Sequence, residues 1–221
     1  DGSELITGLN TRNQSLIWTD NAVHAMEFVG PPFIFNFRQL GSNCGIAGQH
    51  AAIELDGRIF WMGAKDFFVY DGAVKNLPCT VRRYVYDDFN YDQKEKVYAG
   101  TNQEFREVTW LYPSKNATEV DRYVSYNPVE NYWTFGTTIF TTWEDKEVFQ
   151  NILTTGQEAD GDNYLYTNEP EGIYTADGQR QEAFLESSEF DTTPPSYGPG
   201  DSIMYLDRIV PDFTINDGGR V

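Results

Sequence analysis

The stretch from His50 to Cys79, HAAIELDGRIFWMGAKDFFVYDGAVKNLPC, decides which fold class this sequence favours. Four short runs with strand character follow one another in it, at residues 51–55, 58–62, 66–70 and 73–77. Two of their three connections are Asp-Gly pairs, at residues 56–57 and 71–72, and Asp-Gly favours two-residue hairpins because glycine accepts positive φ. Four antiparallel strands this short cannot bury their own faces, so the sheet needs similar sheets packed against it, as in a propeller blade.

A repeat of large aromatic residues gives the same indication. Trp18, Trp61, Trp110 and Tyr166 each lie in a predicted strand, at separations of 43, 49 and 56 residues. Propeller blades recur every ~40–50 residues, so these spacings fit blades with insertions in the later repeats. We therefore predict an all-β fold, a β-propeller with an incomplete set of about four blades in this segment and one short inserted helix. The alternative is a β-sandwich in which the aromatics are placed by chance.

The expected boundaries follow from turn signals and glycine-rich connections. We expect an incoming loop at residues 1–14 and a β-propeller segment at 15–221, with blades at 15–48, 49–86, 101–143 and 160–213 and a helix insertion at 87–99. The sequence ends shortly after Asp217-Gly218-Gly219, which reads as the middle of a turn. Such an end leaves an edge strand unpaired, so we expect more chain, or another molecule, to complete the fold.

Two local predictions concern the helix and the first blade. Residues 80–86 read as extended, and residues 90–98 read as a helix that Asp87 or Asp88 caps and Gly100 ends. In the first blade, Phe33, Phe35 and Phe37 alternate along a predicted strand. Alternation places them on one side of the strand, which we expect to be buried.

The charge balance limits the classes of partner. The chain has 16 basic and 34 acidic residues, a net charge of −18, which repels phosphate backbones and disfavours a basic nucleic-acid-binding groove. It has no run of about 18 apolar residues, so no membrane span is expected. It opens on Asp1 without a signal segment, and we expect it to be processed or part of a longer product.

The candidate nucleophiles and bases are few. Cys44 and Cys79 are most simply unlinked core thiols, consistent with assembly in a reducing cytosol. Cys44 with His50 could form a nucleophile and its base, but no third orienting group is evident. His24 alternates with apolar neighbours in a strand and is interpreted as structural.

Charged motifs also favour structural roles. Asp87-Asp88 is better interpreted as a helix cap than as an acid/base pair. Residues 158–163 resemble a calcium loop only loosely, since they lack the ligand spacing and closing Glu of an EF-hand. Arg82-Arg83 is expected to alternate across a strand, one residue outward and one toward a loop or a neighbouring subunit. No phosphate loop, zinc spacing or nucleophile elbow is found, so we predict no enzyme, no catalytic or metal-ligating residue and no cofactor.

Five segments carry a resemblance to a known family: SLIWTDNAVHAMEFVG, FNFRQLGSNCGIAGQHAAIELDGRIFWMGAKDFFVYDG, LPCTVRRYVYDDFN, DRYVSYNPVENYW and LDRIVPDF. In them the chain resembles the tail-hub proteins of short-tailed bacteriophages, also called nozzle or packaged-DNA-stabilisation proteins. The resemblance extends from about Ser15 to Phe213, and IWTD, NCG, DGRIFWMG and LPCTVR are its more specific words. None of these is a catalytic signature. The chain is shorter than hub proteins usually are, which implies a segment with an incomplete propeller.

The resemblance implies a structural virion protein of the phage tail, assembled in the host cytoplasm. Its subunits would form a six-fold ring, with a head-tail adaptor protein and tail fibres or a tail tip protein as partners. The ring would form a channel for DNA exit below the portal and adaptor and would stabilise packaged DNA. A negatively charged lumen would let the duplex pass without sequence-specific binding.

Two other functions stay open at this point. A propeller tail protein could bind or depolymerise surface polysaccharide, with aromatics such as Trp133 and Trp143 stacking on sugar rings. A generic protein-interaction propeller is the third possibility, and it would form no ring-shaped assembly.

Overall fold

The computed structural model describes residues 2–11, 14–146, 149–158 and 161–168, together with 175–176, 179–180 and 208. The chain divides into two compact units, Asp1–Ile173 and Tyr174–Val221. In the second unit the described strands are β16 (Thr175–Ala176) and β17 (Gln179–Arg180), which pair antiparallel. Most of the blade expected at 160–213 therefore lies outside the described residues, as does the segment LDRIVPDF apart from Arg208.

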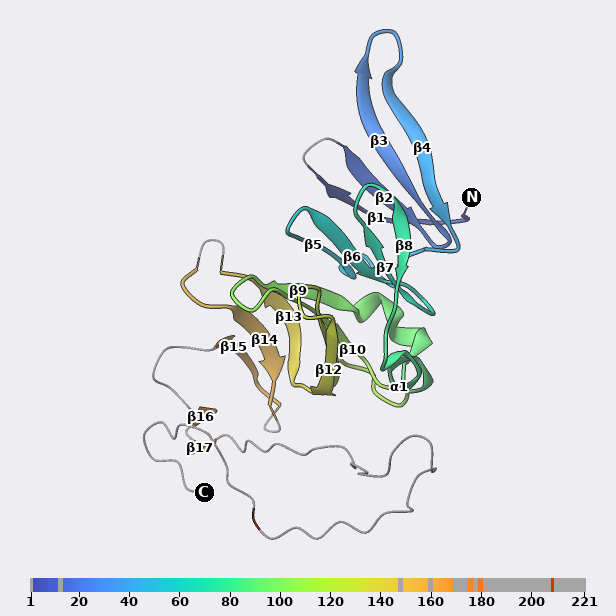
Figure 1. Cartoon of the computed structure of the whole chain (residues 1–221). Coiled ribbons are helices and arrows are strands. Elements are labelled where there is room, and N and C mark those ends of the chain that lie inside the picture. Colours follow the sequence, from blue (N-terminus) through green and yellow to red (C-terminus); the bar gives the residue numbers. More distant parts are fainter. Residues whose placement is uncertain are drawn as a thin grey trace. The chain divides into compact units, whose positions relative to one another are not determined.

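The first unit is all-β: its described strands form four antiparallel sheets in which the strands follow one another in chain order (Figure 1). The first two sheets are β1 (Leu5–Asn10), β2 (Ser15–Thr19), β3 (Ala22–Gly30) and β4 (Ile34–Ser42), then β5 (Ala52–Leu55), β6 (Arg58–Met62), β7 (Phe67–Tyr70) and β8 (Val74–Leu77). The next two are β9 (Tyr98–Asn102), β10 (Glu107–Tyr112), β11 (Arg122–Asn127) and β12 (Tyr132–Thr137), then β13 (Phe140–Glu144), β14 (Leu153–Gln157) and β15 (Asn163–Thr167).

The four strands expected in the second sheet are confirmed, each within one residue at either end. The turn between β5 and β6 has positive φ at both central residues, +53° at Asp56 and +75° at Gly57. This is the type I′ geometry whose twist matches that of the flanking strands, and it explains why Asp-Gly stands there.

Three tryptophans occupy the same place in successive sheets. Trp18, Trp61 and Trp110 lie on the second strands β2, β6 and β10, and all three side chains are fully buried. The rings of Trp18 and Trp61 meet edge to face at 5.5 Å between centroids. One continuous apolar core extends from the first sheet to the third, so the sheets stabilise one another.

Indole N–H groups connect different sheets. The Nε1 of Trp61 donates to the carbonyl of Cys44, in the connection before β5, at 2.9 Å. Trp110 Nε1 donates to the carbonyl of Ala51, at the start of the second sheet, at 3.1 Å. Trp143 on β13 donates to the carbonyl of Thr101 on β9, at 2.8 Å. Each indole therefore satisfies its polar atom outside its own sheet.

The first strands of the later sheets lie next to each other. β9 contacts β5 on one side and β13 on the other. A parallel bridge joins His50 to Tyr98 at the start of β9, and Ala99 N donates to the His50 carbonyl at 2.7 Å. The second, third and fourth sheets are thus joined through the strands with which each begins.

The fourth member of the aromatic repeat lies in a strand, as expected, but its place in the sheet differs from that of the three tryptophans. Tyr166 lies on β15, the third strand of its sheet, and not on a second strand. The sequence pattern also missed β14, whose Thr-Thr-Gly centre has little apolar character.

The incoming loop expected at residues 1–14 is wrong, because β1 pairs with β2 along Leu5–Asn10 and forms the edge of the first sheet. As an edge strand, β1 pairs with one neighbour only and needs few apolar residues, so its sequence resembles that of a loop.

The burial expected for Phe33, Phe35 and Phe37 is also wrong. Their exposed fractions are 80%, 46% and 62%. The pairing of β2 with β3 ends at Met26, so within the described part of the chain no third strand pairs with the outer part of the β3–β4 hairpin and no layer covers it.

The helix is displaced from the expected range 87–99. The segment expected to be extended contains α1 (Arg82–Asp87), in which Val85 and Tyr86 are buried, so tertiary packing overrides the β propensity of VRRYVY. Residues Tyr91–Lys96 form η1, a 3₁₀ helix capped by the Asn90 side chain, and Gly100 lies in β9. Asp88 follows the end of α1 and does not cap the start of a helix.

Among the described residues, none of the helices is long and apolar enough to cross a membrane.

We predict that Trp61→Phe destabilises the protein by about 1–3 kcal/mol more than Trp18→Phe. Both side chains are fully buried, but Trp61 Nε1 has the Cys44 carbonyl as its acceptor, whereas Trp18 Nε1 has no hydrogen-bond partner among the described residues. The first change leaves a buried carbonyl unpaired and the second does not. Urea unfolding of the two variants measures the difference, and equal losses of stability would contradict the role given to the indole bond.

Candidate functional site

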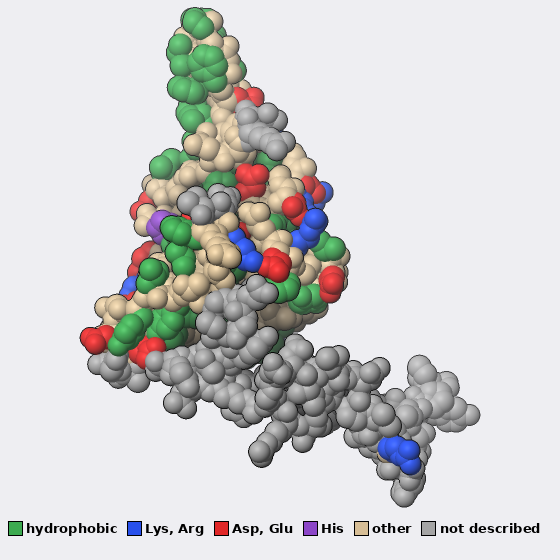
Figure 2. Space-filling model, turned by 90° about the vertical axis from the view of Figure 1, so that its left-hand side faces the viewer, with side chains coloured by type: hydrophobic (Ala, Val, Ile, Leu, Met, Phe, Trp, Pro, Cys, Tyr) green, Lys and Arg blue, Asp and Glu red, His purple; other side chains and the backbone are tan. Residues whose placement is uncertain are grey.

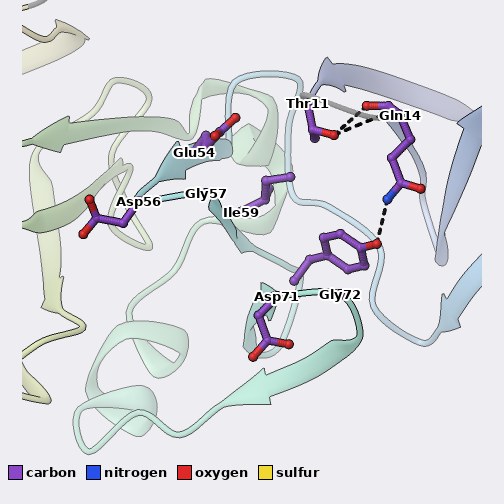
Figure 3. A pocket seen from close by; sticks show the side chains of 9 residues that line it. Thr11, Gln14, Glu54, Asp56, Gly57, Ile59, Asp71 and Gly72 are labelled. Carbon is purple, nitrogen blue, oxygen red and sulfur yellow. Dashed lines mark hydrogen bonds between the residues drawn. The ribbon is translucent and has the colours of Figure 1, made fainter.

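A pocket of about 570 Å³ lies between the β1–β2 turn and two turns of the second sheet (Figure 3). Its lining is polar and apolar in about equal parts and consists of Thr11, Gln14, Glu54, Asp56, Gly57, Ile59, Tyr70, Asp71 and Gly72. The two Asp-Gly hairpins place Asp56 and Asp71 there, and Gln14 Nε2 donates to the Tyr70 hydroxyl at 2.6 Å across the pocket. The pocket is therefore a consequence of packing hairpin ends of two sheets against each other.

The three carboxylates of this pocket do not converge. In Figure 3 the side chains of Glu54, Asp56 and Asp71 point in three different directions. Asp71 accepts a hydrogen bond from Lys75 at 2.7 Å, which lowers the pKa of its carboxyl, and Asp56 lies 3.4 Å from Arg106. An acid/base pair needs two carboxyl groups facing one substrate atom, and this arrangement does not provide it.

Cys44 and His50 do not form a nucleophile and base. The Cys44 side chain is buried in the core, with 2% of its surface exposed. His50 lies on the surface and stacks on the Tyr98 ring at 5.0 Å between centroids. Among the hydrogen bonds of the described residues, none joins the two side chains, so each serves the packing of its own neighbourhood.

The paired charges near α1 form ion pairs within the chain. Arg82 pairs with Asp66, and its guanidinium lies 5.9 Å from the centre of the Tyr86 ring. Arg83 Nε lies 3.5 Å from Asp87, and both side chains are exposed. The expectation that Arg82 and Arg83 alternate across a strand is wrong, because both lie on the helix.

A polar cluster that the sequence analysis missed lies where the end of α1 meets the third sheet. Asp121 accepts hydrogen bonds from the Ser114 backbone N–H and hydroxyl, both at 2.7 Å. Arg122 contacts Asp121 at 3.1 Å and Asp88 at 3.4 Å. The neighbouring Tyr112 is fully buried, and burial raises the pKa of its hydroxyl. Since Tyr112 is closed to solvent, its hydroxyl cannot reach a ligand, and the cluster stabilises the junction between α1 and the third sheet. In the sequence, only the adjacent charged residues Asp121-Arg122 could have indicated this cluster.

The loop that loosely resembles a calcium site is described at Glu158 and at residues 161–163. Glu158 N donates to the Asp162 carbonyl at 3.1 Å, and Gly161 N donates to the Glu158 carbonyl at 3.0 Å. The Glu158 carboxylate accepts a hydrogen bond from the Tyr166 hydroxyl at 2.6 Å. Within the described residues, no three His, Cys, Asp or Glu side chains gather as metal ligands, and this loop is a turn between β14 and β15.

The tryptophans considered for sugar stacking are half-buried. The Trp133 ring centroid lies 4.9 Å from that of Phe67 and 6.1 Å from that of Trp110, and its Nε1 donates to the Pro78 carbonyl. Trp143 lies against Gly100, where an added Cβ would come within 2.1 Å of its ring. Each indole therefore packs against its neighbours in the chain.

Comparison with known proteins does not assign this chain to a family. No protein-family model matches the chain, and no curated protein is significantly similar to it.

We predict that Cys79 reacts slowly with iodoacetamide in the native protein. Burial raises the pKa of its thiol from 9.0 to about 11, so at pH 8 the thiolate fraction is roughly 100-fold below that of an ordinary thiol. Alkylation rates of a Cys44→Ala variant, measured from pH 7 to pH 11, should still rise above pH 10. The same variant in urea is the control, and its rate should be half-maximal near pH 9 and level off by about pH 10. A native rate that levels off near pH 8 would contradict this and indicate an activated nucleophile.

Proposed function

We propose that this chain is a structural subunit of a phage tail hub, or nozzle, in which the four-stranded sheets are blades of a β-propeller. Six copies form a ring below the portal and adaptor, and the ring continues the channel through which DNA leaves. The chain acts as a wall of this channel and not as an enzyme. The sequence segments that resemble tail-hub proteins motivate the proposal, and the packing of the sheets supports it.

The observation that carries the proposal is the contact of β9 with β5 and β13, the first strands of the neighbouring sheets. In a propeller, the innermost strand of each blade lies beside the innermost strands of its neighbours around a central axis. Here β9 lies between β5 and β13, and the parallel bridge from His50 to Tyr98 continues this relation at the start of the strands. Strands in chain order within each sheet are the other feature that blades require.

The net charge supports passage of DNA without binding. Each phosphate held by a Lys or Arg adds to the affinity of a protein for DNA and slows its movement. With a net charge of −18, and with many described Lys and Arg residues paired to carboxylates, such as Arg82 with Asp66 and Lys75 with Asp71, the surface has little positive charge to offer. The duplex would stay solvated in such a channel.

Co-expression of the chain with a portal-adaptor complex of a short-tailed phage tests the proposal. Negative-stain images should show six-fold rings bound below the adaptor, and mass photometry should show the added mass of six subunits. Only monomers in both measurements would contradict the proposal.

A second measurement tests whether duplex DNA passes the channel wall without binding to it. Gel-shift titration with duplex DNA at 150 mM salt should show no retardation at micromolar protein. Tight, salt-sensitive binding would contradict a lumen that leaves the duplex mobile.

A further inference from the structure

The β3–β4 hairpin extends beyond the rest of its sheet (Figure 1). The last residue of β3 that pairs with β2 is Met26, while the pairing of β3 with β4 continues to Gly30 and Ile34. In the space-filling view the projecting end is covered by hydrophobic side chains (Figure 2). The hairpin tip, defined here as residues 28–35 with the sequence FVGPPFIF, has no polar side chain.

The tip is apolar on both of its faces. Phe28 pairs with Phe35, and their rings meet at 5.9 Å on one face. Val29 follows at a register shift of the hairpin, and because the tip has no polar side chain, whichever face it occupies stays apolar. The exposed fractions are 72% for Phe28, 53% for Val29 and 80% for Phe33.

The exposed apolar area of the tip is comparable to the largest apolar patch of a typical monomer. The three phenylalanines of the tip, Phe28, Phe33 and Phe35, expose roughly 400 Å² between them if each side chain has about 200 Å². The largest apolar patch on a typical monomer is ~300–600 Å² and is often functional. The tip is therefore expected to lie in an apolar environment. Because the tip is convex, this environment must surround it and not only cover one face.

A polar boundary limits the depth of the apolar region. Glu27 pairs with Asn36 just below the tip, and the Arg38 guanidinium lies 3.4 Å from the Glu27 carboxylate. From Phe28 to the turn, three or four residues of strand span roughly 10 Å. Apolar faces of interfacial segments enter a bilayer by ~5–10 Å, so this length matches the boundary between headgroups and acyl chains.

Backbone groups of the tip also suit an apolar surrounding. Pro31 and Pro32 carry no N–H, so the turn has two fewer donors to satisfy. The strands on either side bond to each other, and Phe35 N donates to the Phe33 carbonyl at 2.5 Å. A ribbon with open edges cannot cross a bilayer, but a tip of this length can enter its surface.

We propose that the β3–β4 hairpin tip inserts into a lipid surface with neutral headgroups. A flat protein surface would cover one face of the tip and leave the other exposed. A second copy of this chain offers, at its described pocket, a lining with three carboxylates, which does not suit an uncharged tip. The net charge of −18 opposes binding to anionic lipids, so insertion depends on the apolar side chains alone. This inference does not depend on the proposed function.

Flotation of the full chain with phosphatidylcholine vesicles tests the inference. The unchanged chain should float with the vesicles, equally well at 0.1 M and 0.5 M salt. Phe33→Ser combined with Phe35→Ser should lower the bound fraction at least ten-fold. Both side chains lie outside the buried core, so the thermal unfolding of the variant should change little.

Phe105→Ser is the matched control, because Phe105 has 53% of its surface exposed in the β9–β10 turn, away from the hairpin. It should float as the unchanged chain does. Three results would overturn the inference: no flotation of the unchanged chain, binding only to phosphatidylserine vesicles with loss at 0.5 M salt, or equal flotation of the hairpin variant. If the hairpin variant instead changes the mass of the protein in lipid-free gel filtration, the tip binds a second copy and the inference is wrong.

Discussion

The indole N–H groups of Trp61, Trp110 and Trp143 bond to backbone carbonyls outside their own sheets, and the packing of the sheets depends on these bonds. An indole is large enough to fill the space between two sheets and has one donor that must find an acceptor there. The acceptor fixes how one sheet lies against the preceding one. At β9 this approach is so close that position 100 must be glycine, since any Cβ would overlap the Trp143 ring.

The sequence predicts the parts of this fold in which local signals agree. In the second sheet, strand alternation and the Asp-Gly turns indicate the same boundaries, and the structure has them. The three buried tryptophans were also visible as a repeat. Local signals failed where neighbours decide the structure: β1 is an edge strand with a loop-like composition, and α1 forms from residues of β propensity because Val85 and Tyr86 pack into the core.

The functional features were harder to predict from the sequence than the fold, for a physical reason. Alternation along β4 indicates that Phe35 and Phe37 share a face, but burial depends on whether another layer covers that face, and none of the described segments does. The pocket arises from turns of two sheets that are 40 or more residues apart, and the cluster around Arg122 joins a helix end to a sheet. Such long-range neighbours leave no pattern in a single sequence. The structure adds two features to the sequence analysis: the exposed β3–β4 hairpin and the contacts between the first strands of the sheets. Neither is a set of titratable groups.

Cross-linking tests the joined first strands most directly. In a Cys44→Ala, Cys79→Ala background, the pair His50→Cys and Tyr98→Cys places two thiols at the parallel bridge between the start of the second sheet and β9. Strand neighbours lie about 5 Å apart, within the range of Cα separations that a disulfide spans. Mild oxidation of the native protein should give rapid and complete intramolecular cross-linking, seen by mass spectrometry. A control pair at exposed positions, Asn36→Cys in the β3–β4 hairpin and Glu130→Cys in the β11–β12 turn, should stay reduced. Thiols at 50 and 98 that stay reduced in the folded protein would contradict the account.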